Sequence, residues 1–598
     1  MSEQKLWQFW VDRGGTFTDI VALDPKGELH THKLLSENPE QYPDAALAGI
    51  RYFLNVPQTQ PIPVEQIRCV KMGTTVATNA LLERKGEAVA LVTQQGFADA
   101  LEIGYQHRPD IFALNIQKPT PLYQTAIEVA GRLDAQGKWL EPLDEPATKR
   151  ALQTLFAQGY RALAVVFMHA YLNPEVELTI AQWARDIGFS QVSTSSETSA
   201  LIKMIARGRT TVVDAYLSPI LRRYVEQVSK ELPNVDLSFM QSHGGLCQAE
   251  NFQGKDAILS GPAGGIIGAI ASAHSLNRHQ VIGFDMGGTS TDVSHYAGKL
   301  ERSFETEIAG TQMRVPMLDI HTVAAGGGSI ISVNNGEIRV GPESAGANPG
   351  PAAYRRGGPL SVTDANVLLG RIQAQHFPQV FGPNANQPLD RNTVQTQFTQ
   401  LAEPLGMSAE ALAEGALQIA VETMAQAISK ISTQRGYDLS DYTLISFGGA
   451  GGQHACAVAE SLGIQRLLQH PFSGVLSAFG MGLAEMRELS TQSCHLALSD
   501  LAAIEAEIQT LIAHNTQQLA QQNSQAERHE IRLQLHYQGS DSLLNTPLEF
   551  PLMRNLKEQL INLQLSFEKS HQQQFGFILP NTPIAIAAFE HHHRKCHP

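Results

Sequence analysis

Short apolar runs alternate along the chain with glycine-rich turns and with amphipathic stretches of helical period. The runs AVALVT (88–93) and RALAVVFMHAY (161–171) are almost continuously apolar and predict buried strands. The stretches 205–232 and 408–435 predict long helices. Because predicted strands and helices interleave, the pattern indicates an α/β protein.

One pattern of apolar and polar positions occurs twice. Residues 10–20 read WVDRGGTFTDI and residues 284–293 read FDMGGTSTDV, so Asp12 corresponds to Asp285, 285 − 12 = 273 positions later. Each copy follows one apolar run and leads into another, which predicts a strand, a tight glycine turn and a second strand. The sequence therefore predicts two equivalent β-hairpins.

The residue types of these hairpins suit a phosphate. Adjacent glycines let backbone N–H groups approach an anion closely, and hydroxyl groups beside them add donors. Carboxylates at the start of the turn could hold Mg²⁺ against the phosphates, which gives Asp12 and Asp285 a catalytic and metal-binding role. The alternative is that each motif is merely a turn, but two matching copies argue against it, and no P-loop motif occurs. The predicted phosphate-binding residues are Gly14, Gly15, Thr16, Gly287, Gly288 and Thr289.

A third glycine-rich turn completes the pattern. Residues 442–463 (YTLISFGGAGGQHACAVAESLG) predict a strand, a glycine turn and a helix whose N-terminus faces a bound nucleotide. Alone this turn is a weak signal; its order after the two hairpins gives it weight. Two phosphate hairpins and an adenosine turn predict the two-lobed fold of actin, Hsp70 and sugar kinases, with ATP between the lobes. The adenosine-type residues are Gly448, Gly449, Gly451 and Gly452.

The order of the segments predicts the domains. Residues 5–204 are expected to form the first lobe and 205–495 the second, followed by a smaller α+β domain at 503–590. The glycine-rich tract 319–359 is expected to be an irregular functional loop. The last residues, 591–598 (HHHRKCHP), have no apolar pattern and are expected to lie outside the third domain, which would then be incomplete.

Composition and charge exclude several classes. The net charge is −14 without a concentrated basic stripe, which argues against a nucleic-acid partner. No run of about 18 apolar residues predicts a membrane span, and the N-terminus has no secretion signal. The five cysteines are scattered and form no CxxC pair, which fits a reducing compartment. We therefore expect a cytoplasmic enzyme.

Assembled in order, the segments resemble the hydantoinase A/5-oxoprolinase family over about residues 7–589. The matching segments are VDRGGTFTDIVA, MGTTVATNALLERKGE, SHGGL, LSGPAGG, FDMGGTSTDVS, DIHTVAAGGGSI, GPESAGANPGP and SFGGAGGQHACAVAESLGI. Two further segments, HKLLSENPEQYPDAALAGI and IGYQHRPDIFALNI, are more similar to the 5-oxoprolinase branch than to the N-methylhydantoin or acetone carboxylase branches.

The resemblance implies an ATP-dependent opening of a cyclic amide such as 5-oxoproline, which gives glutamate. In this family ATP phosphorylates the lactam oxygen, and a separate B region or subunit completes the hydrolysis. The cofactors implied are ATP and Mg²⁺. The alternatives are an ATP-dependent N-methylhydantoinase A or acetone carboxylase subunit and, from another class, an actin- or Hsp70-like nucleotide switch without small-molecule chemistry.

Other polar residues have weaker claims to a role. The family often has cysteine in the segment that here reads PAAY, so a thiol at Ala353 is not required. Asp19 and Asp292 recur in both hairpins and are expected to orient their own loops, with a base or metal role as the alternative. Histidines in glycine-rich loops are more often structural than catalytic, and arginines at the start of a helix are more often structural than anion-binding. The residues concerned are His243, His321, His454, Arg207 and Arg209.

Overall fold

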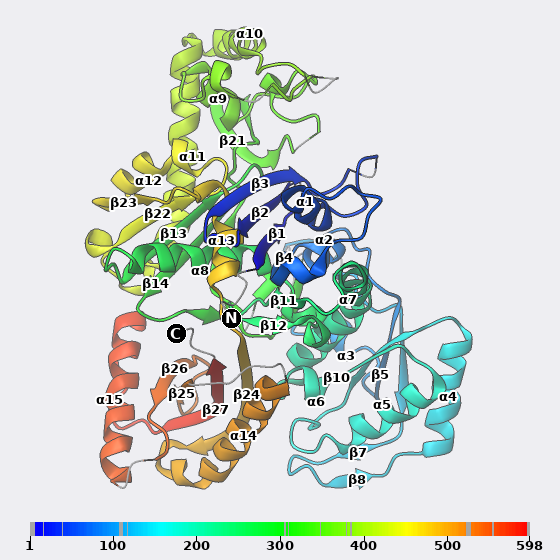
Figure 1. Cartoon of the computed structure of the whole chain (residues 1–598). Coiled ribbons are helices and arrows are strands. Elements are labelled where there is room, and N and C mark those ends of the chain that lie inside the picture. The colour runs from blue at the N-terminus through cyan, green and yellow to red at the C-terminus, as the bar shows by residue number, and fades with distance from the viewer. Residues whose placement is uncertain are drawn as a thin grey trace.

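The computed structural model describes residues 6–594, except 16, 39, 107–111, 117, 304–305, 309, 347, 378, 383–385, 522–527 and 553–554. Two central sheets carry three peripheral parts: a parallel sheet with its helices, a cap of helices and the C-terminal domain (Figure 1). Among the described helices, none is long and apolar enough to cross a membrane.

The first lobe is built on a six-stranded sheet with the order β12-β11-β4-β1-β2-β3. Its first three strands form an antiparallel meander, and β4 and β11 then add in parallel beside β1. The core strands are apolar on both faces because helices cover the sheet. The strands are β1 (Trp7–Arg13), β2 (Phe17–Leu23), β3 (Leu29–Leu35), β4 (Ile67–Thr74), β11 (Asp236–Met240) and β12 (Leu246–Gln248), and the helices are α1 (Ala45–Leu54), α2 (Val76–Leu82) and α7 (Met204–Glu231).

The second lobe repeats this order of strands. Its sheet runs β19-β14-β13-β22-β23, again with three antiparallel strands followed by two parallel ones. The duplication predicted from one motif thus extends over five strands in each lobe, and the expected two-lobed α/β fold is confirmed. The strands are β13 (Gln280–Met286), β14 (Thr291–Ala297), β19 (Ile320–Val323), β22 (Thr443–Phe447) and β23 (Arg466–Gln469).

Two glycine-rich helices, α8 (Ser260–His274) and α13 (Leu476–Leu483), pack together between the lobes. Their backbones approach so closely that a Cβ on Gly480 would lie 1.9 Å from the carbonyl oxygen of Gly264. Lys71 of β4 donates to the carbonyl oxygens of Gly482 and Ala484, at the C-terminal end of α13, at 2.6 and 3.2 Å. A cation there stabilises the negative end of the helix and joins it to the first sheet.

A separate four-stranded parallel sheet lies within residues 5–204, so this expected lobe contains two sheets (Figure 1). Arg207, at the start of α7, is buried and donates to Ser195, Leu201 and Phe167, so it joins α7 to this part of the chain. The elements are β5 (Val89–Gln94), β6 (Thr125–Val129), β9 (Ala162–Val166) and β10 (Gln191–Thr194), with α3 (Ala100–Ile103), α4 (Glu145–Ala157), α5 (Glu175–Ile187), α6 (Ser195–Thr198) and the β7–β8 ribbon (Arg132–Leu133, Trp139–Glu141).

The boundary expected between residues 204 and 205 is wrong, because β11 and β12 complete the first sheet. The tract 319–359 is also more regular than expected: it contains β19 and a hairpin of β20 (Ser329–Asn334) and β21 (Glu337–Ser344). A cap of helices follows this hairpin (Figure 1). The remaining elements of this lobe are α9 (Val362–Leu368), α10 (Arg391–Ala402), α11 (Ala409–Ile431), α12 (Ala455–Ser461) and the short strands β15 (Arg302–Ser303), β16 (Thr306–Ile308), β17 (Thr311–Met313) and β18 (Met317–Leu318).

The C-terminal domain has an antiparallel sheet of order β24-β27-β25-β26 with two helices. The boundary expected at residue 590 is wrong, because the last strand continues through Arg594 between β24 and β25. Its three histidines are buried in the sheet, where His591 contacts Asn515 and His529 at 3.0 Å each, so a run without apolar residues still forms a central strand. The elements are β24 (Arg487–Ala497), β25 (Arg528–Tyr537), β26 (Leu544–Leu548), β27 (Ile584–Arg594), α14 (Glu505–Gln521) and α15 (Leu556–Phe575).

The contact between α8 and α13 predicts a sharp sensitivity to added volume. Gly480→Ala places a methyl group against the backbone of Gly264, so we expect it to destabilise the folded protein by about 1–3 kcal/mol. The measurement is the urea midpoint of unfolding. Gly474→Ala is the matched control because a Cβ there meets no atom within 4 Å; equal midpoints for the two variants would contradict the close packing.

Candidate active site

The two glycine hairpins have the same local geometry. Asp12 lies opposite Asp19 across the first hairpin, and Asp285 lies opposite Asp292 across the second. In each turn the first glycine N–H donates to the carbonyl three residues on, from Gly14 to Phe17 and from Gly287 to Ser290, at 3.0 Å in both. Thr16 lies outside the described residues. The other described residues of the two motifs occupy equivalent positions in the two hairpins.

The carboxylates of both hairpins lie within electrostatic reach of one another. The pKa of Asp285 is raised well above its ordinary value, first by burial and then by the negative charges of Asp292, Asp12 and Asp19. The pKa of Asp12 is raised to about 7 by burial and by Asp19, against a smaller opposing effect of Lys33. The structure therefore brings together four acidic side chains from two lobes, 273 residues apart in sequence.

Two of the four carboxylates already have protein partners. Asp19 pairs with Lys33, with 2.5 Å between its Oδ1 and the lysine Nζ, and Asp292 accepts a hydrogen bond of 2.6 Å from Thr322. Oδ1 of Asp12, in contrast, is buried and has no hydrogen-bond partner among the described residues. Asp19 and Asp292 are thus held by their neighbours, while Asp12 presents a buried oxygen that a cation could satisfy.

Glycines line the space around these carboxylates. Gly448 has a φ of 81°, and a Cβ on it would lie 2.3 Å from Oδ1 of Asp285, so only glycine fits there. On the other side, a Cβ on Gly261, at the N-terminus of α8, would lie 3.0 Å from Oδ1 of Asp12. The positive end of α8 thus faces the carboxylate cluster.

The predicted adenosine turn lies directly against the second hairpin. Ala450 N–H donates to the carbonyl of Met286 at 2.9 Å, which fixes Gly448–Gly452 beside Asp285. A Cβ on Gly288, Gly449 or Gly452 would meet no atom within 4 Å, so all three backbones border open space. The third glycine segment and the second hairpin therefore form one surface.

Sequence reasoning missed another part of this surface. Gly327 and Gly328 donate to the carbonyls of Gly287 and Gly288, at 3.1 and 2.6 Å, and so brace the second turn from behind. The signal was the AAGGGS run within 319–359, but its position against the hairpin depends on the antiparallel pairing of β14 with β19. The chain between Val323 and Ser329 is thereby placed beside the turn.

The donor set fits Mg²⁺ and a polyphosphate. Mg²⁺ prefers carboxylate oxygens and water, and Asp12 and Asp285 offer buried oxygens that repel each other when both are charged. Phosphates are bound by backbone N–H groups of glycine turns and by helix N-termini, which the hairpins and α8 provide. The cluster can thus hold a divalent cation against a triphosphate.

The other candidate residues have contacts outside the four carboxylates. His454 is buried and bonded to Asn366 at 3.1 Å, and burial lowers its pKa to about 4, which fits a structural role. Asp319, next but one to His321, pairs with Arg435 at 2.6 Å, and no metal-type cluster is found at these positions among the described residues. His243 is buried beside Arg302, with the pKa of its imidazole lowered well below the usual value, first by burial and then by Arg302.

The repeated five-strand order and the carboxylates between two glycine hairpins define a two-lobed protein of the actin, Hsp70 and sugar-kinase fold class. The family described as Hydantoinase/oxoprolinase N-terminal region matches residues 8–188, and the family Hydantoinase/oxoprolinase matches residues 207–490. Together these matches cover more than half of the chain. The chain belongs to the hydantoinase/oxoprolinase family.

Named relatives agree with this assignment. The chain is 40% identical to 5-oxoprolinase of Saccharomyces cerevisiae over 96% of its own length and 48% of that protein, so it spans about half of this relative. It is 31% identical to caprolactamase subunit alpha of Pseudomonas jessenii, covering 99% of this chain and 87% of the subunit. The crystal structure of the ATP-dependent caprolactamase of that organism superposes with a TM-score of 0.88 at 29% identity, covering 98% of this chain and 87% of that one.

The raised pKa of Asp12 makes stability depend on pH. Because the folded protein keeps a proton on this carboxyl up to about pH 7, while the unfolded chain releases it near pH 4, stability falls as pH rises through this window. Asp12→Asn removes this contribution. At about 1.4 kcal/mol per pKa unit, the fall from pH 4 to pH 8 should shrink by up to about 4 kcal/mol.

The measurement is the unfolding free energy in metal-free buffer across this pH range. The exposed Asp541→Asn serves as the control and should leave the profile unchanged. A profile for Asp12→Asn as steep as that of the wild type would show that Asp12 is charged in the folded protein.

Proposed function

We propose that this chain is the ATP-binding and phosphorylating part of an enzyme that opens a cyclic amide, with 5-oxoproline as substrate and glutamate as product. The observation that carries the proposal is the cluster of buried carboxylates between two glycine hairpins. The 40% identity to a 5-oxoprolinase supports the choice of substrate. ATP dependence is supported by the name of the caprolactamase that shares the fold.

The proposal assigns each part of the cluster a role. Asp12 and Asp285 hold Mg²⁺ and take part in catalysis, and the hairpin turns bind the phosphates through their N–H groups. The turn beside Asp285 accommodates the adenosine. The phosphate-binding residues are Gly14, Gly15, Thr16, Gly287, Gly288 and Thr289, and the adenosine-type residues are Gly448, Gly449, Gly451 and Gly452.

The chemistry requires activation of an unreactive amide. The lactam oxygen attacks the γ-phosphorus of ATP and ADP leaves, so the ring carbon becomes bonded to a good leaving group. Water then adds to that carbon and the ring C–N bond breaks, which leaves an acyl phosphate on the opened chain. A second water hydrolyses the acyl phosphate to the carboxylate of glutamate and free phosphate. Two positive groups near the γ-phosphate lower the barrier of the first step. One is the cation that the carboxylates hold, and the other is the N-terminus of α8. Bound Mg²⁺ supplies charge neutralisation of the phosphates.

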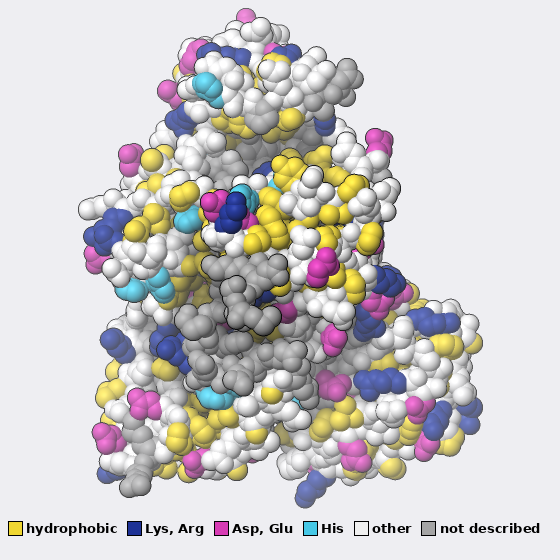
Figure 2. Space-filling model, viewed as in Figure 1, with side chains coloured by type: hydrophobic (Ala, Val, Ile, Leu, Met, Phe, Trp, Pro, Cys, Tyr) yellow, Lys and Arg dark blue, Asp and Glu magenta, His cyan; other side chains and the backbone are white. Residues whose placement is uncertain are grey.

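The proposal includes a B-type region or subunit that completes the hydrolysis. It is supported by the named alpha subunit among the relatives and by the coverage of only half of the yeast protein. Hydrophobic side chains also gather on the face of the first lobe over β3, α1 and α2 (Figure 2). On these elements the side chains of Leu35, Tyr52 and Leu82 are 44, 63 and 57% exposed. A hydrophobic patch of this kind is typical of an interaction surface. A cytoplasmic location is supported by the four described cysteines, all of them free thiols.

Removing either hairpin carboxylate should abolish turnover without unfolding the protein. We expect Asp12→Ala and Asp285→Ala to lower Mg²⁺-dependent ATP hydrolysis by about 100-fold or more, because the Mg²⁺ that neutralises the phosphates loses a ligand. Asp441→Ala, an exposed position of the second lobe, is the control. Initial rates are measured with 5-oxoproline, a hydantoin and acetone as alternative stimulants. Normal turnover by both variants would refute the assignment of the hairpins.

Release of glutamate should require the B-type partner. The chain is incubated with ATP, Mg²⁺ and 5-oxoproline, with and without the B region from the same source. We expect ADP without stoichiometric glutamate from this chain alone, and glutamate once the partner is added. Stoichiometric glutamate from the single chain would overturn this division of labour, and stimulation only by a hydantoin or acetone would overturn the choice of substrate.

A further inference from the structure

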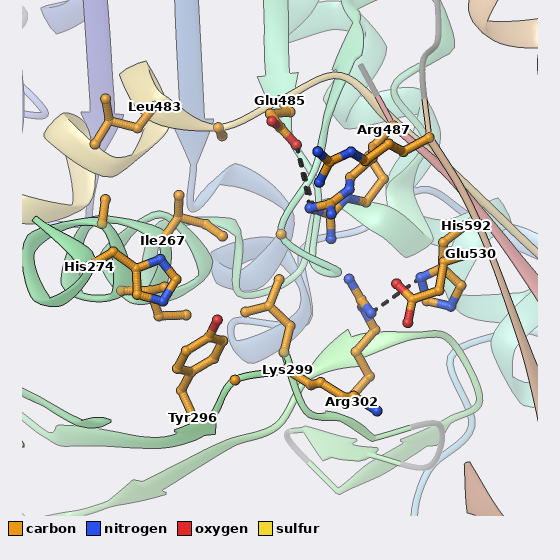
Figure 3. Close-up of a pocket in the computed structure, with 18 of the residues that line it drawn as sticks. Ile267, His274, Tyr296, Lys299, Arg302, Leu483, Glu485, Arg487, Glu530 and His592 are labelled. Carbon is orange, nitrogen blue, oxygen red and sulfur yellow. Dashed lines mark hydrogen bonds and ion pairs between the residues drawn. The ribbon is translucent and has the colours of Figure 1, made fainter. Parts of the chain in front are cut away.

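A cavity of about 760 Å³ lies between α8, the second lobe and the C-terminal domain. Figure 3 shows Arg302 and Arg487 extending toward this space from different parts of the chain, with His274 on α8 at its opposite side. Ile267, the lining residue of α8 that is nearest to Gly261 in sequence, is 6 residues along the helix, about 9 Å, and His274 is 13 residues along it, about 20 Å. The cavity is therefore separate from the carboxylate cluster, although α8 borders both.

The lining of this cavity carries an excess of positive charge. Six lining residues are cationic and two, Glu485 and Glu530, are acidic. Glu530 is already paired with Arg532, at 2.7 Å from its guanidinium, and Glu485 lies 3.9 to 4.0 Å from two arginines. The cationic residues are Lys299, Arg302, Arg487, Arg528, Arg532 and Arg594. The acidic side chains thus leave much of this charge without a close counter-ion.

Arg302 is the least compensated of these groups. Its guanidinium donates to the carbonyl oxygen of His243 and contacts Nδ1 of His592, all at 3.3 Å, and no carboxylate of the described residues lies within 4.0 Å of it. Burial, together with the neighbouring charges of Arg487 and Arg532, lowers the pKa of Arg302 to about 9, against smaller opposing effects of Glu590 and Glu530. A buried cation in this position is costly unless an anion accompanies it.

Arg487, at the start of β24 in the C-terminal domain, is a second buried guanidinium without a close carboxylate partner. The side chain is largely buried, its Nε has no hydrogen-bond partner among the described residues, and Glu485 is 4.0 Å away. Glu590, the other nearby acid, is engaged by Gln534 at 2.8 Å and by His592 at 2.9 Å. Two buried guanidiniums therefore converge on one cavity with donor groups to spare.

We propose that this cavity binds a small molecule carrying a multiply charged oxyanion, either a phosphate or a multivalent carboxylate. Guanidinium groups bind such oxyanions through paired, charge-assisted hydrogen bonds. Apolar side chains on α8 and α13, Ile267, Ile270 and Leu483, provide a wall for the body of the ligand. The site is independent of the proposed function, since it shares no residue with the hairpins.

The test is calorimetric titration of the whole chain with inorganic phosphate and, separately, with citrate. Both are titrated in the presence of a saturating non-hydrolysable ATP analogue, with Mg²⁺ in excess over citrate, so that the hairpin site, including its γ-phosphate position, is already occupied. We expect one site, with affinity weakened at least about tenfold by Arg302→Met and by Arg487→Met. Arg355→Met is the control, because Arg355 pairs with Asp390 outside this cavity. Tighter binding of phosphate would indicate a phosphate site, and tighter binding of citrate would indicate a site for a multivalent carboxylate.

The stability of the variants provides a second readout. Without added anion, Arg302→Met should unfold at the same temperature as the wild type or higher, because a repelled buried charge has been removed. Phosphate or citrate, added with the same nucleotide present, should raise the melting temperature of the wild type and of Arg355→Met more than that of Arg302→Met. If Arg302→Met fails to fold, the single variants Lys299→Met and Arg528→Met test the proposal instead, because both side chains are exposed. Each should bind the anion at least about threefold more weakly than the wild type. Equal affinities for wild type and cavity variants would overturn the proposal.

Discussion

Mutual repulsion among buried carboxylates is the constraint on which the centre of this molecule depends. Asp12 and Asp285 arrive from different lobes and raise each other's free energy when both are ionised. Only a rigid frame keeps such groups together, and the two matching sheets supply it because each hairpin begins in a strand with neighbours on both sides. The lobes are thus held in an arrangement that the local charges oppose.

The protein offsets part of this repulsion with its own groups. Lys33 pairs with Asp19, and Thr322 donates to Asp292, so the outer acids of each hairpin are partly neutralised. The N-terminus of α8 contributes partial positive charge beside Asp12. The inner acids keep capacity for a cation, which is the property a phosphoryl-transfer site needs before its substrates arrive.

The hairpins, the third glycine turn and the long helices could be predicted because each depends on local sequence. The motif at Asp12 recurs at Asp285, and glycine positions report backbone geometry directly. The partition of β11 and β12 into the first sheet could not be predicted, since the pairing of β11 with β4 joins strands about 170 residues apart. The bracing by Gly327 depends on the same kind of distant pairing. The end of the last strand was missed for another reason. A periodic pattern of apolar residues reveals only strands that pack through apolar side chains, whereas His591 is buried by ring stacking and a hydrogen bond.

The contact of α8 with α13 is made largely of backbone. Gly264, Gly268 and Gly480 bring the two helices close together, and Met481 and Leu476 of α13 fill the hollows beside Gly264 and Gly268. Side chains seated in such hollows must lift out before one helix can slide along the other. The pair therefore resists sliding, and it fixes the spacing of the two sheets that it contacts.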